Sequence, residues 1–326
     1  MNPQLIVEPD DGLAPVLEFI ESAQTALRIK QFTFLEEQLI DAVIARRNAG
    51  VDVRVMLNRA KSGGERANDE TFARLEAAGV SVAWTNPAFY VTHEKSMVAD
   101  SRAALIATFN LAIKYFTQTR DFGVITTDPA QVAQVIEGFE ADWARSEWGP
   151  SGNAGLLWSN SNSRRVMAQF IDTAQTRLDI QHPKFVDTVI LDRIVAAADR
   201  GVKVHILCGG RHGISDSDVL DTFASLRTFH YFGVRVHKQK NLRAHAKLVV
   251  VDRRRALLGS MNIDRSAFDL RRELGIMIDD ASIVERLTTV FDADWTSSHQ
   301  YHAPDPLHPD RHTEDDFPFD PDLIHE

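Results

Sequence analysis

Two short motifs of identical spacing bring together side chains that can do chemistry on a phosphate group. An imidazole can act as nucleophile or as general acid and base near neutral pH, and an ammonium group binds phosphate oxygens. A protonated lysine cannot ligate a metal, which argues against a zinc-type site. We expect no metal ion and, separately, no cofactor. Each motif has a histidine, a lysine two residues later and an aspartate five residues after that: His93, Lys95 and Asp100, then His245, Lys247 and Asp252.

The motif segments, residues 93–100 and 245–252, have the β-branched content of strands, most clearly in the second copy, HAKLVVVD. Because side chains alternate between the two faces of a strand, the histidine and lysine of one motif share a face. The aspartate stands seven positions after the histidine and falls on the other face. The sequence therefore predicts that His and Lys act together, while Asp100 and Asp252 support the strand end or an adjacent turn.

Further polar residues follow both motifs at matched spacings. Each motif precedes a strand that ends at an asparagine, with a hydroxyl two residues before it on the same face, and we expect both to donate to phosphate oxygens. An acid lies 28 residues after each histidine. We expect it to hold the second ring nitrogen of that histidine and fix its tautomer. These residues are the asparagines Asn110 and Asn262, the hydroxyls Thr108 and Ser260, and the acids Asp121 and Glu273.

The chain is an internal duplication. Residues 19–32 align with the segment that begins at Phe170, at an offset of 151, and the motif region repeats at an offset of 152. A strand-borne histidine is more often a packed or surface residue than a catalyst. Two copies in register, each followed by an asparagine and an acid at matched spacings, make chemistry the better interpretation.

The duplication predicts two homologous halves, residues 1–150 and 151–298. The junction, residues 147–165, is rich in Gly, Ser and Asn and is typical of a linker. Residues 299–326 are rich in Pro and Asp, and we expect an extended or disordered tail there. Within each half, short Val-, Ile- and Phe-rich strands alternate with helix-period segments. This pattern predicts an α/β fold in which each half is a largely buried sheet covered by helices.

Composition narrows the classes of partner. The net charge of -10 argues against a surface built for duplex nucleic acid, which usually carries a basic stripe. The single cysteine, Cys208, allows no internal disulfide and is compatible with a reducing cytosol. There is no signal-peptide pattern and no apolar run near 18 residues. We therefore expect a cytoplasmic protein without a transmembrane segment, which would meet a lipid substrate from the aqueous side.

The doubled His-x-Lys-x4-Asp motif, followed by Gly-Ser or Ala-Thr and then Asn, resembles the signature of the phospholipase D superfamily. The resemblance runs from about Ala23 to Trp295. The segments RDFGVIT and GSMNIDRSAFDLRRELGI are similar to compact bacterial proteins related to cardiolipin synthases. The first copy departs from the signature, because Ala107 and Thr108 stand where the second has Gly259 and Ser260.

The resemblance implies two mixed sheets flanked by helices, with an active site at the interface between the halves. It also implies metal-independent, ping-pong exchange of a phosphodiester through a phosphohistidine. His93 would attack phosphorus, and His245 would protonate the leaving alcohol and then activate water or an alcohol. The remaining implied roles are phosphate binding by Lys95, Lys247, Asn110 and Asn262, and support of the histidines by Asp121 and Glu273. The sequence leaves three functions open: a phospholipid phosphodiesterase or phosphatidyltransferase, a nucleic-acid phosphodiesterase, and a binding module without activity.

Overall fold

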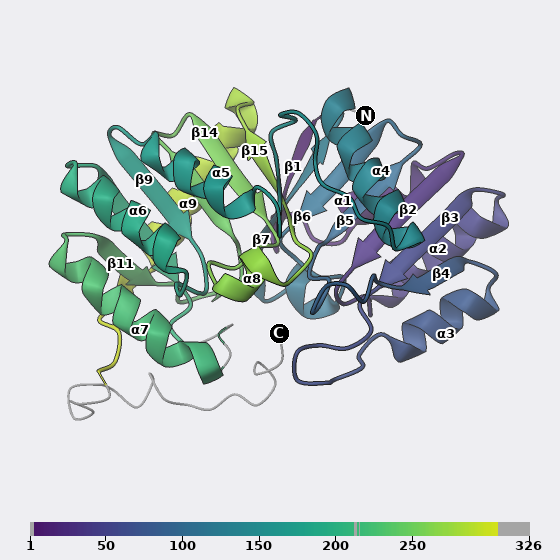
Figure 1. Ribbon diagram of the computed structural model, residues 1–326, viewed down its shortest axis with the longest axis horizontal. Coiled ribbons are helices and arrows are strands. Elements are labelled where there is room, and N and C mark those ends of the chain that lie inside the picture. The colour runs from purple at the N-terminus through teal and green to yellow at the C-terminus, as the bar shows by residue number, and fades with distance from the viewer. Residues whose placement is uncertain (1–2, 212–213, 215, 306–326) are drawn as a thin grey trace.

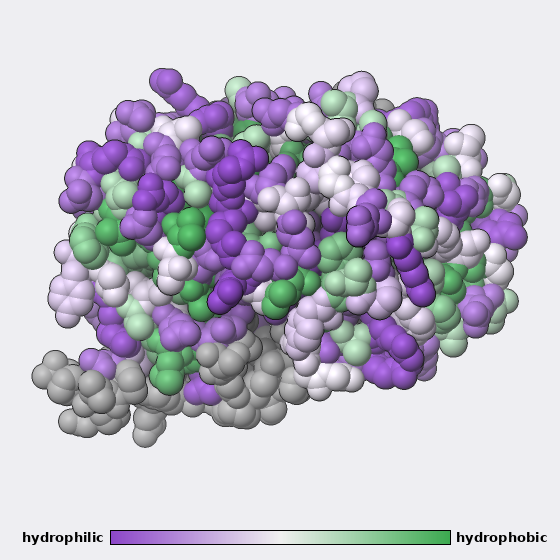
Figure 2. Space-filling view, in the orientation of Figure 1, coloured by the Kyte–Doolittle hydropathy of each residue, from purple (hydrophilic) through white to green (hydrophobic). Residues whose placement is uncertain are grey.

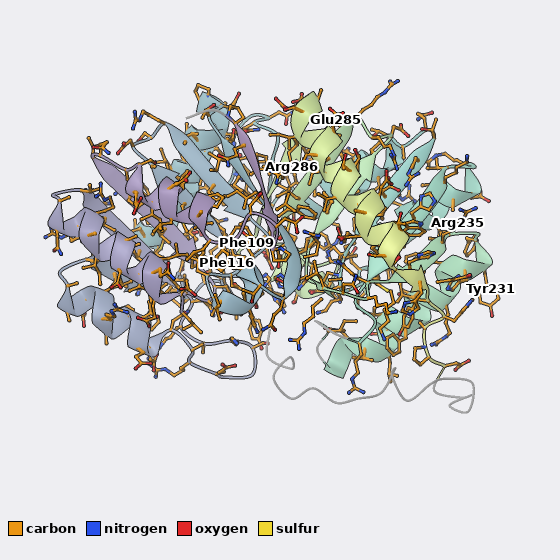
Figure 3. The ribbon with its side chains drawn as sticks, turned by 180° about the vertical axis from the view of Figure 1, so that it is seen from behind. Phe109, Phe116, Tyr231, Arg235, Glu285 and Arg286 are labelled. Carbon is orange, nitrogen blue, oxygen red and sulfur yellow. The ribbon has the colours of Figure 1, made fainter. Side chains whose placement is uncertain are left out.

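Two mixed sheets lie side by side in the computed structural model, with helices on their outer faces (Figure 1). The structure describes residues 3–305 except 212, 213 and 215. The face seen in Figure 2 is largely hydrophilic, with small apolar patches scattered over it. Seen from behind, α9 (Ala281–Ser297) covers the second sheet, as Figure 3 shows. The expected α/β architecture of two halves is confirmed.

The first half contains the strands β1 (Gln4–Glu8), β2 (Ala26–Gln31), β3 (Asp52–Leu57), β4 (Ser81–Trp84), β5 (Ser96–Ala99), β6 (Ala103–Ala107) and β7 (Thr119–Thr126). Its helices are α1 (Ala14–Glu21), α2 (Glu37–Asn48), α3 (Asp69–Ala77), the 3-10 turn η1 (Ile113–Phe116) and α4 (Pro129–Ala144). Glycine residues and an aspartate cap mark the ends of these helices. Gly50 and Gly79, just after α2 and α3, have φ of +91° and +74°. Asp128 accepts from two backbone amides at the start of α4.

The second half contains β8 (Leu156–Trp158), β9 (Arg177–Gln181), β10 (Lys203–Cys208), β11 (Arg235–Lys238), β12 (Arg243–Ala244), β13 (Leu248–Val251), β14 (Arg255–Gly259), β15 (Leu274–Ile278) and β16 (His299–Gln300). Its helices are α5 (Ser163–Asp172), α6 (Thr188–Asp199), α7 (Asp216–Tyr231), α8 (Arg265–Asp269) and α9. Asp280 begins α9 by accepting from the amides of Ser282 and Ile283. The two halves thus use the same device to start their last helix.

The two sheets share one strand order. The first runs β1-β7-β6-β5-β2-β3-β4, and the second runs β16-β11-β10-β9-β13-β14-β15-β8, which is the same order read backwards with β16 added. In each, three strands are parallel and the remaining strands of the shared order are antiparallel. Because corresponding strands carry corresponding motifs, the sequence duplication is also a duplication of topology.

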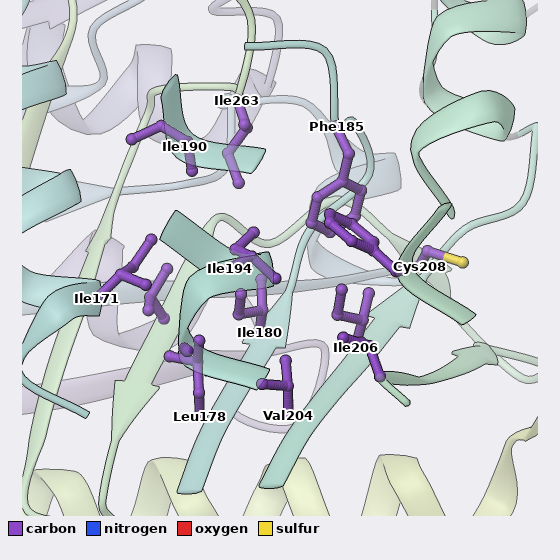
Figure 4. Packing of buried hydrophobic residues seen from close by; sticks show 14 of the residues in the cluster. Ile171, Leu178, Ile180, Phe185, Ile190, Ile194, Val204, Ile206, Cys208 and Ile263 are labelled. Atoms are coloured by element: carbon purple, nitrogen blue, oxygen red, sulfur yellow. The ribbon is translucent and has the colours of Figure 1, made fainter. Parts of the chain in front are cut away.

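Three apolar clusters hold the fold together. One lies between the first sheet and its outer helices, and a second lies between β9, β10 and the outer helices of the second half, as Figure 4 shows. The third draws residues from both halves, including Ile106 and Phe122 from the first and Leu258 and Leu287 from the second. Because both halves contribute to this cluster, they pack directly against each other and are not joined by a linker alone.

Two expectations about chain segments were wrong in part, and one strand was missed. Residues 147–165 are more than a linker, because Leu156–Trp158 is buried and forms β8, paired with β15. The strand β1 was not anticipated at all. The predicted tail begins with β16, and Tyr301 and Ala303 after it are buried. In these short segments, burial of a few apolar side chains determines the structure, even where the surrounding sequence is rich in Gly, Pro or Asp. Residues 306–326 lie outside the described residues.

Candidate active site

The two motifs meet at the seam, by which we mean the boundary between the two halves. β12 of the second half pairs in parallel with β7 of the first. The amide of His93 donates to the carbonyl oxygen of Arg272, 2.9 Å away, and the amide of Ala246 donates to that of Arg120 at the same distance. Each motif is therefore hydrogen-bonded to the residue that precedes the acid of the other half.

The acids cross over between the halves. His93 Nδ1 lies 3.0 Å from both carboxylate oxygens of Glu273, and His245 Nδ1 lies 2.7 Å from Asp121 Oδ1. The expectation that each acid supports the histidine of its own half was wrong. Matched spacing of 28 residues correctly singled out the acids, but the pairing of β12 with β7 and of residue 92 with residue 272 exchanges their partners. All four side chains are buried.

An acid at Nδ1 fixes the tautomer of each ring and leaves Nε2 as its reacting nitrogen. The lysines sit against the same histidines. Lys95 Nζ donates to the carbonyl oxygen of His93 and Lys247 Nζ to that of His245, both at 2.7 Å. Lys247 Nζ is also 2.9 Å from His245 Nε2. The strands β5 and β13 begin only after these residues, so each lysine reaches back along an irregular segment rather than along a pleat.

The two hydroxyl groups that we expect to donate to phosphate oxygens make hydrogen bonds within the fold in this structure. Thr108 Oγ1 donates to Asp121 Oδ1 at 2.5 Å and accepts from the amide of Phe122. Ser260 Oγ accepts from the amide of Leu274 at 3.1 Å and donates to its carbonyl oxygen. Each hydroxyl thus joins the segment that leads to the asparagine with the segment that carries the acid. We therefore assign them to support of the acids.

The departure of the first motif from the signature leaves the strand pairing unchanged. Ala107 lies opposite Gly123, and Gly259 lies opposite Gly275, in equivalent antiparallel ladders. A Cβ at Gly259 would stand 2.4 Å from the backbone of Gly275, so the second half needs glycine there. The first half accommodates the methyl group of Ala107, which is buried. Thr108 consequently keeps the position that Ser260 has in the other half.

Burial sets the protonation of Glu273. The side chain is fully buried, and desolvation raises the pKa of its carboxyl to about 8, although the nearby charges of Lys95 and Arg271 act in the opposite direction. The carboxyl that contacts His93 Nδ1 therefore gives up its proton less readily than an exposed glutamate does. Carboxyl groups with a pKa shifted in this direction are common at catalytic sites.

The asparagines lie at the seam with buried amide groups. Asn110 is fully buried and Asn262 is 4% exposed. Among the described residues, neither amide atom of Asn110 has a hydrogen-bond partner, and Oδ1 of Asn262 has none. Burying an amide without a partner is costly, by about 1–3 kcal/mol, so amide groups left in this way are suited to contact a ligand. Asn110 also keeps both of its N–H donors for a phosphate oxygen.

The motif aspartates lie at the far end of their strands. Asp100 accepts from the backbone amides of residues 24–26, and Asp252 accepts from those of residues 175–177. Burial opposes ionisation, but these donors outweigh it and lower the pKa of both carboxyls below the usual range. Both residues have a positive φ, near +50°. Asp100 and Asp252 therefore clamp the turn after the strand, away from the histidines.

Sequence reasoning missed a pair of buried ion pairs that cross the seam. Arg120 of β7 contacts Asp294 of α9, and Arg272 contacts Asp142 of α4, each with two hydrogen bonds. The signal was available, since FEADW and FDADW, which carry these aspartates, recur at the same offset as the motifs. Lys30, buried between Glu94 and Asp142, gave no such signal because its counterpart is Gln181.

Comparison with known proteins identifies this arrangement. The family model described as "Cardiolipin synthase, PLD-like domain" matches the chain twice, over residues 16–143 and 167–295. The chain belongs to the phospholipase D superfamily. Each matched range contains one motif, one of the two asparagines and one of the two acids, so the sequence duplication is a duplication of this domain.

Relatives within the phospholipase D superfamily are distant but cover most of the chain. The major cardiolipin synthase ClsA of Bacillus subtilis is 24% identical over 91% of this chain and 69% of its own length. A cardiolipin synthase of Oceanobacillus iheyensis is 26% identical over 87% of this chain and 67% of its own. The chain thus spans about two thirds of the length of these relatives.

Solved structures confirm the phospholipase D-like fold. Phosphatidylserine synthase from Haemophilus influenzae matches with a TM-score of 0.73 at 13% identity, covering 93% of this chain and 88% of that one. Polyphosphate kinase from Porphyromonas gingivalis matches with a TM-score of 0.71 at 16% identity, covering 93% of this chain and 50% of that one. Because such different proteins share the fold, the fold alone does not determine the substrate.

Proposed function

We propose that this phospholipase D superfamily protein is a phospholipid phosphodiesterase or phosphatidyltransferase that works through a phosphohistidine intermediate. The observation that carries the proposal is the crossed pair of histidine–acid contacts at the seam. Two imidazoles oriented by acids, accompanied by two lysines and two asparagines, supply a nucleophile, a proton donor and binding groups for non-bridging oxygens.

In the first step, His93 Nε2 attacks phosphorus, a P–N bond forms, and the P–O bond to the leaving alcohol breaks. His245 transfers its proton to the leaving oxygen. In the second step, His245 accepts a proton from water or an acceptor alcohol. The oxygen of that acceptor attacks phosphorus, and the P–N bond to His93 breaks. Lys95, Lys247 and the two asparagines bind the phosphate oxygens throughout, and the enzyme returns to its starting protonation state.

The choice of a phospholipid rests on two supports. The relatives named above are a cardiolipin synthase in each case, and the solved structure that covers most of both chains is a phosphatidylserine synthase. The net charge of -10 disfavours a polyanionic nucleic acid, which an acidic surface repels. Among the described residues, no helix has both the length and the apolar character to cross a membrane.

Trapping the intermediate tests the proposal. We expect purified protein to release head groups from phospholipid vesicles in EDTA, and to form a transfer product when a primary alcohol is added. With a phosphodiester whose leaving group is nitrophenolate, which departs without protonation, His245→Ala should accumulate a covalent adduct. Intact-mass and peptide analysis should place it on His93. His93→Ala should form none.

A matched control is His299→Ala, since His299 is an exposed histidine on β16. This variant should turn over like the wild type. Absence of both head-group release and transfer from every common phospholipid would overturn the lipid assignment. EDTA-resistant cleavage of nucleic acid in its place would identify the alternative substrate class.

Exposed apolar side chains near the seam suggest how the protein meets a lipid surface. Tyr90 and Leu270, joined by a backbone hydrogen bond across the seam, are 61% and 54% exposed, and Ile113 is 59% exposed. Each lies three residues before or after a residue of the site. We expect Leu270→Asp and Ile113→Asp to weaken vesicle binding about tenfold each, because insertion of a charge into lipid is costly.

Cosedimentation with phospholipid vesicles measures this effect, and a short-chain soluble substrate separates binding from chemistry. Turnover of the soluble substrate should stay within about twofold of wild type. Tyr231→Asp is the matched control, because Tyr231 is 89% exposed but lies at the outer edge of the second half (Figure 3). If all three variants lose vesicle binding equally, the apolar residues at the seam have no special role.

A further inference from the structure

Glu8 is a buried carboxyl group beside one of the two histidine–acid pairs. It ends β1 and lies opposite Asp121 in the antiparallel ladder with β7. Residues directly opposite in such a ladder point to the same face, with Cβ atoms about 4.5–5.5 Å apart. Both side chains are fully buried, and Asp121 in turn contacts His245 Nδ1. Glu8 therefore stands next to the acid that orients His245.

The surroundings keep this carboxyl neutral near pH 7. Neither carboxylate oxygen of Glu8 has a hydrogen-bond partner of normal geometry among the described residues, and the backbone amide of Gly12 only partly opposes the rise in its pKa. The charges that act on it are those of Asp121 on β7 and of Asp10 and Asp11 on its own loop. Arg120 of β7 donates to its backbone carbonyl oxygen, and α9, which carries Arg286 and Asp294, packs against β1. Both arginines contact other carboxylates: Arg120 contacts Asp294, and Arg286 contacts Asp11. Burial, and next the charge of Asp121, raise the pKa of Glu8 to about 9.

The other half has no such group. The counterpart of Glu8, at the offset of 151, is Ser159, whose Oγ accepts from the amide of Glu273 at 2.7 Å. A second difference lies on the opposite side of the acids. Thr119 Oγ1 donates to Asp121 Oδ2 at 2.6 Å, but the equivalent residue in the second half is Arg271, a positive charge near Glu273. One acid thus has a second carboxyl beside it, and the other has a guanidinium.

We infer that Glu8 is a positioning residue that acts through Asp121 on His245 alone: once it ionises, its negative charge favours the protonated form of His245, whereas the acid that contacts His93 has no second carboxyl beside it. This charge acts against the ammonium of Lys247, which lies 2.9 Å from His245 Nε2. The inference rests on the proposed function, in which His245 is the proton donor and His93 the nucleophile. It adds a group that distinguishes the two copies of a duplicated site at alkaline pH.

Titration of the histidine rings tests this coupling without any substrate. In full-length protein labelled at histidine, we expect the NMR signals of His245 to titrate in two steps, the second near the pKa of about 9 of Glu8. Glu8→Gln, which keeps size and polarity, should remove the second step. Ser159→Ala should retain it, and His93 should show no such step in any variant. A single step for His245 in the wild type would overturn the inference.

The pH dependence of kcat/KM tests the effect on reaction. At pH 7, Glu8→Gln and wild type should agree within about twofold, because Glu8 is neutral there. The alkaline limb should fall at lower pH in Glu8→Gln, leaving it about tenfold slower at pH 9.5, since His245 loses its proton earlier. Coinciding alkaline limbs would overturn a role in the reaction. If the wild type turned over no phosphodiester, the proposed function would fail while the ring titration still decided the coupling.

Discussion

Replacing Asp121 by Asn should lower steady-state turnover by about two to four orders of magnitude, and the loss should be traced to His245 rather than to His93. Asp121 contacts His245 across the seam, so its loss disturbs the proton donor and acceptor. Replacing Glu273 by Gln should disturb the nucleophile, His93, because that is the histidine it contacts. The two variants should therefore fail at different steps.

Rapid-mixing kinetics with a nitrophenyl phosphodiester separate these steps. Nitrophenolate leaves without protonation, so Asp121→Asn should still release a burst of about one equivalent before slow turnover. Glu273→Gln should show no burst. The matched control is Asp100→Asn, which weakens a turn at the far end of β5 and should keep both burst and turnover. A burst lost in Asp121→Asn and kept in Glu273→Gln would show that each acid serves its own half.

Glu8→Gln should stabilise the protein at neutral and alkaline pH. The folded protein keeps a proton on Glu8 up to about pH 9, while the unfolded chain releases it near 4.5. The unfolded state is therefore favoured increasingly as pH rises from 4.5 to 9, and the wild type loses stability over that window. At pH 7 the loss amounts to about 3 kcal/mol, which glutamine avoids.

Urea unfolding at several pH values measures this difference. The gap between Glu8→Gln and wild type should be small at pH 4.5, should widen to about 3 kcal/mol at pH 7, and should stop growing above pH 9. Glu18→Gln, at an exposed glutamate on α1, should show no such widening. A gap that is independent of pH would mean that Glu8 ionises alike in both states. Retention of a residue that lowers stability agrees with a functional role.

Much of the site could be predicted from the sequence because the duplication repeats it. A constant offset pairs His93 with His245, Asn110 with Asn262 and an acid with an acid, and such matches survive without any model of the fold. The α/β class followed from the same alternation of strand and helix patterns. The residues that repeat in the two halves were predicted, including Asp100 and Asp252, which stabilise turns.

What depends on contact between the halves could not be predicted from spacing. The exchange of acids follows from β12 joining β7, a pairing of only two residues in a segment without a strand pattern. Alternation along a strand places the hydroxyls of Thr108 and Ser260 on the same face as the asparagines. It does not show that each hydroxyl bonds to the neighbouring segment that carries an acid. Glu8 was missed because its counterpart in the second half is Ser159, so a comparison of the two halves does not single it out.

The crossed support of the histidines also bears on how such a chain arises. Since the acid of each half completes the imidazole of the other, neither half contains a whole histidine–acid pair. A single repeat of this kind would have to bind a second copy of itself, as a symmetric dimer, to complete either pair. Fusion into one chain ensures one copy of each half per molecule and allows the two halves to have different sequences. They can then diverge wherever a residue serves only one histidine, as Glu8 and Ser159 have done.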